Sequence, residues 1–217
     1  MSKIIRVAID GPSGAGKSTI AKAVGKKLGL DYIDTGAMYR AVGYKTLTNS
    51  IDPDDAAAMQ QMLDSTEIDF SKGDIILDGE IVNDKIRTNE MSMMASRVSA
   101  IPAVREKLVE LQRKMGQTKS IIMDGRDIGT NVLTDAEFKF FMTASAEERA
   151  DRRYKELIEK GQDVSYETVL DDIIKRDHND MTRKLNPLKK ADDAIELDTT
   201  GMSIEEVTDF IYKEVTK

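Results

Sequence analysis

Short apolar runs alternate with segments of helical periodicity along most of the chain. The runs that predict buried strands lie near residues 4–9, 31–35, 120–124, 139–142 and 194–197. Between them apolar residues recur at helical spacing, as in the segment that follows the first run and ends at Gly29. Strands that alternate with helices predict an α/β fold, a doubly wound parallel sheet of five strands flanked by helices.

One stretch departs from this alternation. Further helices are predicted over 36–48, 52–62, 88–115 with a break at Pro102, 146–160, 166–180 and 203–215, the last opening with the capping box Ser203 to Glu206. Over 66–84, however, short apolar runs are separated by turns, and Asp78-Gly79 between two such runs is a strong hairpin signal. We interpret 66–84 as a small antiparallel insert outside the main sheet.

The first apolar run leads directly into a glycine-rich segment that fits the pattern G-x-x-x-x-G-K-[ST]. With the residue that follows the pattern, the segment comprises Gly11, Pro12, Ser13, Gly14, Ala15, Gly16, Lys17, Ser18 and Thr19. Glycines permit a loop whose backbone N–H groups surround an anion, and the following helix points its positive end at the same place. Lys17 would reach the β- and γ-phosphates of a nucleoside triphosphate, and the Ser18 hydroxyl would ligate Mg²⁺. A chance glycine-rich turn is disfavoured, because the strand before and the helix after are both present.

Composition and charge narrow the class of protein further. A chain of 217 residues predicts one compact domain, or two at most, and the lack of cysteine excludes disulfides and thiolate metal sites. No apolar run approaches a membrane span, so we expect a cytoplasmic protein. A net charge of −7 argues against nucleic-acid binding, yet nine of the twelve arginines lie between Arg97 and Arg183. Localised arginines in an acidic protein suit a small phosphorylated ligand.

Charged residues follow the third apolar run at its carboxyl end. Asp124 closes that run, where a second acid that organises the metal lies in P-loop proteins, although an ordinary strand-ending aspartate remains the alternative. Arg126 and Asp127 come directly afterwards. Ligands of open α/β sheets bind just outside the carboxyl ends of the strands, so this pair is placed to contact a substrate.

Two predicted helices carry further arginines at helical spacing. Arg149, Arg152 and Arg153 lie near one helical face and could form a cationic lid over the transferring phosphoryl group, or a surface helix paired with Glu147 and Glu148. A weaker signal comes from the next helix, where one face presents Arg176, Asp180 and Arg183. The single histidine, His178, lies in a very polar run, so histidine acid–base chemistry is not expected.

Three classes of P-loop protein compete for this pattern: a phosphotransferase, a GTPase switch and an ATPase that acts on a macromolecule. A GTPase should carry an Asn-Lys-x-Asp motif that reads the base, and no Asn-Lys pair occurs in the chain. The small size and acidic charge favour a small acceptor over a macromolecule.

Several ordered motifs together give a more specific indication. They are IDGPSGAGKST (9–19), DTGAMYR (34–40), ASRVSAIPAVRE (95–106), MDGRDIGT (123–130), SAEERADRR (145–153) and RDHNDMTR (176–183). With these motifs the chain closely resembles the bacterial cytidylate kinases over essentially its whole length. The resemblance implies one domain, 1–217, with a core (1–35, 117–145 and 190–217), a monophosphate-binding region that carries the β insert (36–116) and a helical lid (146–189).

The resemblance also implies a reaction and roles for residues. The reaction would be ATP-dependent phosphorylation of CMP or dCMP with Mg²⁺, by a monomer in pyrimidine metabolism. Thr35, Arg105, Asp127 and Arg183 would face the cytosine; Ser96, Arg176 and Asp180 would hold the sugar; Arg40 and Arg126 would bind the acceptor phosphate. Lys17, Arg126, Arg149 and Arg153 are the expected catalytic residues, and Ser18 and Asp124 the expected metal ligands. Many relatives have serine where this chain has Thr35, and Gly-Thr where it has Ser18-Thr19, so either hydroxyl of that pair could meet the metal.

Overall fold

The computed structural model describes residues 4–71, 73–159 and 161–217, so the expectations for Lys72 and Lys160 lie outside the described residues. The chain forms two compact units. The first consists of the described parts of Met1–Tyr32 and Lys119–Lys217, and the second of Ile33–Thr118. In the described ranges we find no helix long and apolar enough to cross a membrane.

The main sheet has five strands in the order β2-β6-β1-β7-β8, which confirms the predicted parallel α/β sheet. Its strands are β1 (Arg6–Asp10), β2 (Asp31–Asp34), β6 (Ile121–Gly125), β7 (Phe138–Thr143) and β8 (Ile195–Asp198). The central strand β1 pairs in parallel with β6 and β7, so that Ile9 lies opposite both Asp124 and Phe140. This register brings the carboxyl ends of β1 and β6 together, at the place where α/β sheets bind ligands.

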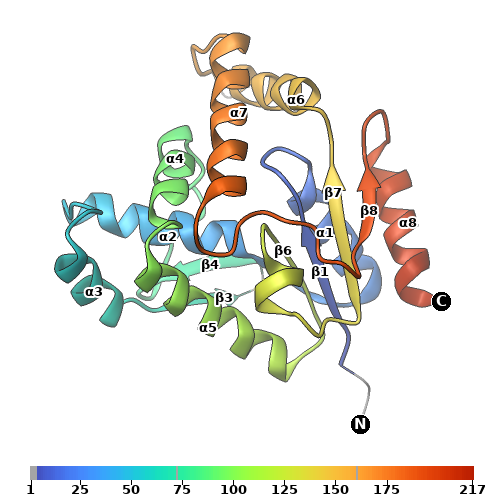
Figure 1. Ribbon diagram of the computed structural model, residues 1–217, viewed down its shortest axis with the longest axis horizontal. Coiled ribbons are helices and arrows are strands. Elements are labelled where there is room, and N and C mark those ends of the chain that lie inside the picture. Colours follow the sequence, from blue (N-terminus) through green and yellow to red (C-terminus); the bar gives the residue numbers. More distant parts are fainter. Residues whose placement is uncertain (1–3, 72, 160) are drawn as a thin grey trace. The chain divides into compact units, whose positions relative to one another are not determined.

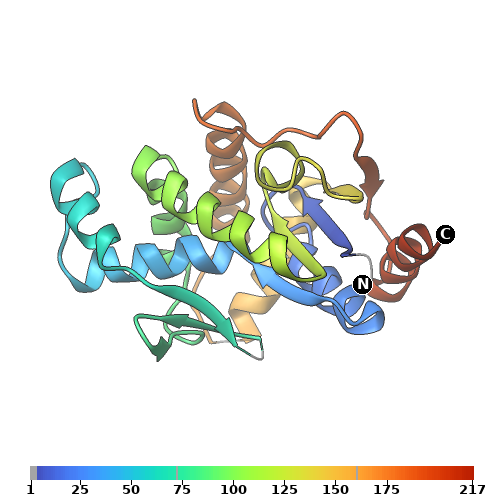
Figure 2. The same cartoon turned by 90° about the horizontal axis from the view of Figure 1, so that it is seen from below.

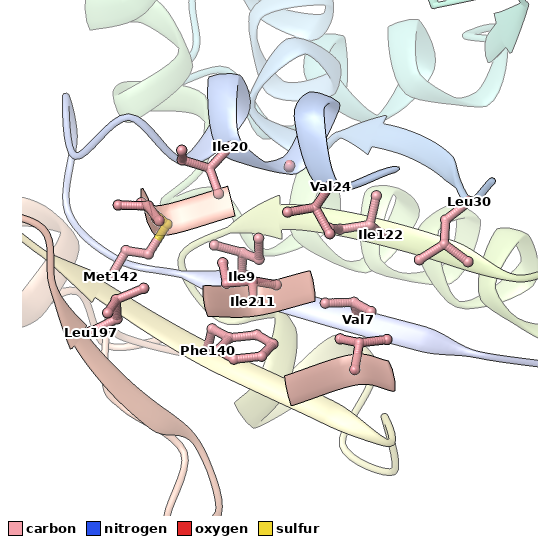
Figure 3. Packing of buried hydrophobic residues seen from close by; sticks show 13 residues of the cluster. Val7, Ile9, Ile20, Val24, Leu30, Ile122, Phe140, Met142, Leu197 and Ile211 are labelled. Carbon is pink, nitrogen blue, oxygen red and sulfur yellow. The ribbon is translucent and has the colours of Figure 1, made fainter. Parts of the chain in front are cut away.

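A continuous apolar core holds the helices α1 (Lys17–Leu28) and α8 (Ile204–Thr216) against this sheet. Both views of the ribbon show the two helices side by side (Figures 1 and 2). The core is made of buried side chains from the strands and from both helices, among them Val7, Ile9, Ile20, Val24, Ile122, Phe140, Met142, Leu197 and Ile211 (Figure 3). Because β1 is buried on both faces, the loop that follows it starts from a fixed position.

Two helices, α6 (Ala146–Glu159) and α7 (Tyr166–Thr182), pack against each other (Figure 1). A small apolar cluster of Ala150, Leu157, Val169 and Ile173 joins them. At one end the rings of Tyr154 and Tyr166 meet edge to face, with centroids 6.1 Å apart. The pair therefore has an apolar contact surface of its own.

The second unit contains the predicted antiparallel insert. Its three strands, β3 (Ile68–Ser71), β4 (Asp74–Leu77) and β5 (Glu80–Ile81), form a separate sheet. Asp78 and Gly79 both have positive φ, 50° and 84°, as a tight hairpin turn requires, so the prediction from Asp-Gly is confirmed. The helices of this unit are α2 (Thr35–Thr48), α3 (Ala56–Asp64), α4 (Asn89–Val98) and α5 (Pro102–Thr118).

Two local features differ from the predictions. The helix predicted over 52–62 begins only at Ala56, because the Asp55 carboxylate accepts the N–H groups of Ala57 and Ala58 and caps the helix there. The segment Ile128–Val132 forms a short π-helix that the sequence analysis does not predict. The break predicted at Pro102 within 88–115 is confirmed, because α4 ends at Val98 and α5 begins at Pro102. At Ser203 and Glu206 the predicted capping box is confirmed.

Candidate active site

The glycine-rich loop connects β1 to α1 and adopts the backbone conformations that its glycines permit. Gly14 and Gly16 have φ of 75° and 81°, in the left-handed region that favours glycine. Gly11 has φ of 150°, and a Cβ atom there would lie 2.1 Å from the carbonyl oxygen of Met142 in β7. Any larger residue at position 11 would push the loop away from the sheet. The chain thus builds the phosphate-binding loop that the sequence predicts.

Lys17 begins α1, and its side chain is buried rather than extended into solvent. Its ammonium group donates to the carbonyl oxygen of Pro12 at 2.7 Å, within the same loop. The pKa of Lys17 is lowered to about 7, mainly by burial and next by the nearby Arg126 cation. The carboxylates of Asp124 and Asp10 act in the opposite direction. A bound anion would supply the negative charge that this buried ammonium needs, so the loop is prepared for a phosphate.

Hard oxygen ligands meet where α1 faces the end of β6. The Ser18 hydroxyl donates to one oxygen of the Asp124 carboxylate at 2.9 Å, and the Tyr32 hydroxyl donates to the other at 2.8 Å. Among the described residues no three carboxylates, histidines or cysteines form a metal-binding group. One carboxylate and one hydroxyl beside a phosphate loop fit Mg²⁺, which keeps several waters and takes its other ligands from phosphates.

Beyond β6 the predicted substrate residues form two ion pairs with α7 and the segment after it. Arg126 Nε donates to Asp180 Oδ2 at 2.7 Å, and Arg183 Nη2 donates to Asp127 Oδ1 at 2.9 Å. The side chains of Asp127, Asp180 and Arg183 are all less than 10% exposed. Residues more than fifty positions apart in the sequence are therefore brought into one charged cluster.

The cations of this cluster control the charge of its carboxylates. Burial alone would raise the pKa of Asp180, but the neighbouring Arg126 and Arg176 cations outweigh it, and the pKa lies below its usual value. Burial by itself would lower the pKa of Arg126, but the neighbouring Asp180 carboxylate outweighs this effect and the pKa of Arg126 is raised. Asp180 is therefore ionised at neutral pH and Arg126 remains a cation. Such a cluster binds an anionic ligand with hydroxyl groups through charge-assisted hydrogen bonds.

The three arginines of α6 have different surroundings. Arg149 is buried and donates to the carbonyl oxygens of Ala144 at 3.0 Å and Ser13 at 2.7 Å, so it contacts the phosphate loop directly. Arg152 pairs with Glu148 and lies near Gly16, where a Cβ atom would be 3.7 Å from its Nη1. Arg153 pairs with Glu156 on the same helix at 2.9 Å. The ion pairs of Arg152 and Arg153 fit the surface-helix alternative. The cationic lid and the catalytic roles of Arg149 and Arg153 stay predictions.

The remaining predicted substrate residues belong to the second unit. Thr35 is the buried first residue of α2, and Arg40 in the same helix pairs with Asp34 at 3.1 Å. Ser96 is half-buried in α4. Arg105 in α5 is buried, and its guanidinium lies 5.9 Å from the ring centre of Tyr39. Asp34, which also caps α2, is a partner that the sequence analysis did not identify.

A cavity of about 560 Å³ opens beside the phosphate loop within the first unit. It lies between the start of α1, the first turns of α6 and the loop that joins β8 to α8, and its lining includes Gly16, Thr19, Met142, Arg152, Thr199 and Met202. The residues after β8 were not among the predicted site residues. Their one signal was the position of 199–203 directly after a core strand, where α/β sheets place ligand-binding loops.

Asp10, the last residue of β1, is a buried carboxylate that the sequence analysis also missed. It accepts the N–H groups of Ile128 at 2.8 Å and Gly129 at 2.7 Å. These bonds tie the start of the π-helical segment, directly after Arg126 and Asp127, to the strand that carries the phosphate loop. Burial raises the pKa of Asp10 from 3.8 to about 6, although both hydrogen bonds oppose the shift.

This raised pKa predicts how stability depends on pH. The folded state holds the Asp10 proton up to a higher pH than the unfolded state does. The contribution of Asp10 to stability therefore falls as the pH rises from its ordinary pKa of 3.8 through its folded pKa of about 6. Asp10→Asn, which resembles the protonated group, should remove the effect. The free energy of unfolding of the wild type, relative to this variant, should fall by about 2 kcal/mol between about pH 4 and about pH 7. Urea denaturation across that range measures it, and a constant difference would contradict the assignment.

Comparisons with known proteins agree with this geometry. The family model described as "Cytidylate kinase" matches residues 7–217. A cytidylate kinase of Clostridium perfringens (strain SM101 / Type A) is 54% identical over 217 residues, covering 100% of both chains. One from Caldicellulosiruptor bescii is 56% identical over 209 residues, covering 94% of this chain and 92% of its own. One from Clostridioides difficile (strain 630) is 52% identical over 209 residues, covering 96% and 97%.

Solved structures with little sequence identity share the fold alone. An uncharacterized protein from Eubacterium ventriosum ATCC 27560 superposes with a TM-score of 0.56 at 16% identity, covering 99% of each chain. The shikimate kinase from Bacteroides thetaiotaomicron superposes with a TM-score of 0.51 at 11% identity, covering 99% of this chain and 100% of its own. The chain therefore shares its fold with these two proteins.

Proposed function

The chain belongs to the cytidylate kinase family, and from this premise we propose that it transfers the γ-phosphoryl group of ATP to CMP or dCMP. The products are ADP and CDP or dCDP. The observation that carries the proposal is the charged cluster of Arg126, Asp127, Asp180 and Arg183, which lies beyond β6, the strand that neighbours the one leading into the phosphate loop. We place the reaction in the cytoplasm and assign it to a monomer.

The donor is assigned to the loop from Gly11 to Thr19 and to the cavity beside it. Backbone N–H groups of the loop and the Lys17 ammonium would bind the phosphates. The cavity of about 560 Å³ starts at Gly16 and Thr19 and has room for a base and its sugar. Ser18 and Asp124 would hold Mg²⁺, which when bound neutralises charge on the phosphates.

The acceptor is assigned to residues that can match its groups. Arg126 would bind the acceptor phosphate, Asp180 and Arg176 the sugar hydroxyls, and Asp127 with Arg183 the base. Of the second unit, Thr35, Arg40, Ser96 and Arg105 are proposed as acceptor contacts from the family motifs. A carboxylate accepts hydrogen bonds and a guanidinium donates them, so these types suit cytidine's hydroxyl, amino and acceptor groups.

The chemical step requires alignment of the two substrates and stabilisation of negative charge, and it does not require a general base. An oxygen of the acceptor phosphate, already ionised at neutral pH, forms a bond to the γ-phosphorus while the bond from that phosphorus to the β-phosphate oxygen breaks. Lys17, Arg126 and the lid arginines, among them Arg149 and Arg153, would stabilise the charge on the transferring group. The exposed His178 has no role in this scheme.

One acceptor panel tests the proposal. Release of ADP from ATP–Mg²⁺ should be fastest with CMP or dCMP, weaker with UMP, and near background with AMP and shikimate. Shikimate represents the P-loop kinases that act on a small metabolite. Preference for any acceptor without a cytosine base would overturn the assignment.

Asp180→Ala should separate the acceptor from the donor. Removal of this buried carboxylate takes away the partner of Arg126 and the proposed contact to the sugar. We expect a raised KM and a lowered kcat for both CMP and dCMP, because a misplaced acceptor spoils the alignment with the γ-phosphate. The KM for ATP should change little. Steady-state kinetics with each substrate varied in turn measure this, and a selective loss of ATP binding would place α7 on the donor side instead.

A further inference from the structure

Asp177, in the middle of α7, lies between the phosphate loop and α6. Its Oδ1 accepts the backbone N–H of Ser13 at 3.4 Å, and its Oδ2 accepts Nη2 of Arg149 at 2.6 Å. Arg149 in turn donates from Nη1 to the carbonyl oxygen of Ser13 at 2.7 Å. Both backbone groups of one loop residue are thus held by side chains from two different helices.

The burial of Arg149 explains why a carboxylate is needed at this place. The Arg149 side chain is 5% exposed. Its Nε and Nη1 donate to the carbonyl oxygens of Ala144 and Ser13, which are neutral and leave the charge of the guanidinium uncompensated. Asp177 supplies the opposite charge at ion-pair distance. A buried cation that loses its partner carries a large desolvation cost, so Arg149 would leave the loop or draw in water.

The α6 helix packs so closely on the loop that Arg149 can act on it directly. A Cβ atom on Gly14 would lie 3.2 Å from Cβ of Arg149. The turn of the loop from Pro12 to Gly14 therefore takes its position from Arg149 on one side and from the sheet, through Gly11, on the other. Arg149 keeps this geometry only while Asp177 holds the guanidinium.

We propose that Asp177 is a positioning residue for phosphoryl transfer, which acts through Arg149 to fix the turn of the phosphate loop at Ser13. The inference rests on the proposed function of the same site. It also assigns two carboxylates of α7 to different substrates. Asp177 pairs with Arg149 beside the phosphate loop of the donor, while Asp180, three residues later, pairs with Arg126 on the acceptor side. Two carboxylates one turn apart should therefore affect different substrates.

Asp177→Asn tests the proposal, since it keeps the shape of the side chain but removes the charge that Arg149 requires. We expect kcat to fall about 10- to 100-fold and the affinity for a fluorescent ATP analogue to weaken, with the KM for CMP within about twofold of the wild type. Asp171→Asn makes the same charge change at an exposed position of the same helix and should behave like the wild type. A kcat of Asp177→Asn within twofold of the wild type would overturn the proposal.

A double-mutant cycle separates positioning through Arg149 from a general structural effect. Arg149→Met and Asp177→Asn should each lower kcat, and the double variant should be no slower than Arg149→Met alone. If the two losses multiply, Asp177 acts independently of Arg149 and the inference is wrong. Thermal unfolding of each variant sets an assay temperature at which all are folded, and analogue binding is read at that temperature without turnover. A wild type that does not phosphorylate CMP would instead refute the proposed function.

Discussion

Lys17→Ala should lower kcat by about three orders of magnitude while the protein stays folded. The ammonium group is buried at the start of α1 and donates to the carbonyl oxygen of Pro12, within its own loop. Its charge is most valuable when negative charge shifts during transfer of the γ-phosphoryl group, so kcat should suffer more than the KM for CMP. Initial rates at saturating ATP–Mg²⁺ and CMP measure the effect.

Two controls make this result specific to the phosphate loop. Lys26→Ala removes an exposed lysine from the same helix and should leave kcat unchanged. Circular dichroism and Tm should show Lys17→Ala folded, because the variant loses a desolvated cation rather than an apolar core contact. Near-normal turnover by a folded Lys17→Ala variant would refute the assignment of the loop to ATP.

Asp127→Asn should narrow the preference for CMP over UMP by about 10- to 100-fold, a change of a few kcal/mol in relative transition-state binding. Cytosine presents an amino donor at position 4, where uracil presents a carbonyl acceptor. An ionised carboxylate only accepts hydrogen bonds, so Asp127 should favour the amino group and repel the carbonyl. The amide keeps the shape of the side chain but adds a donor. The value of kcat/KM should therefore fall for CMP much more than for UMP.

The pairing of Asp127 decides how this experiment is interpreted. Its carboxylate accepts bonds from Arg183 and, at 3.1 Å, from Asn131 Nδ2, so the substitution also weakens the ion pair with Arg183. A general disturbance of the cluster would lower kcat/KM for both acceptors equally and leave their ratio unchanged. The ratio is therefore the readout, and an unchanged ratio would show that Asp127 does not read the base.

Features that depend only on neighbouring residues could be predicted from the sequence. The apolar run before Gly11 and the glycines within the loop specify a strand, a left-handed turn and a helix start, and each of these is a local property of the backbone. Asp78-Gly79 likewise specifies its hairpin, and Ser203 with Glu206 specifies the start of the last helix. Ordered motifs over the whole length then indicated the family, which the comparisons confirmed.

The tertiary structure alone decided which charged residues far apart in the sequence become partners. Arg126 pairs with Asp180, 54 positions away, and the backbone of Ser13 meets Asp177, 164 positions away. Helical spacing placed Arg149, Arg152 and Arg153 near one face but could not tell which of them is buried against the phosphate loop, because side-chain spacing carries no information about the opposing surface. The start of the π-helical segment after Asp127 is held by Asp10, whose carboxylate accepts hydrogen bonds from two backbone N–H groups of that segment. Such pairings exist only once the sheet has brought the ends of β1 and β6 together, since hydrogen bonds and ion pairs depend on distance in space and not along the chain.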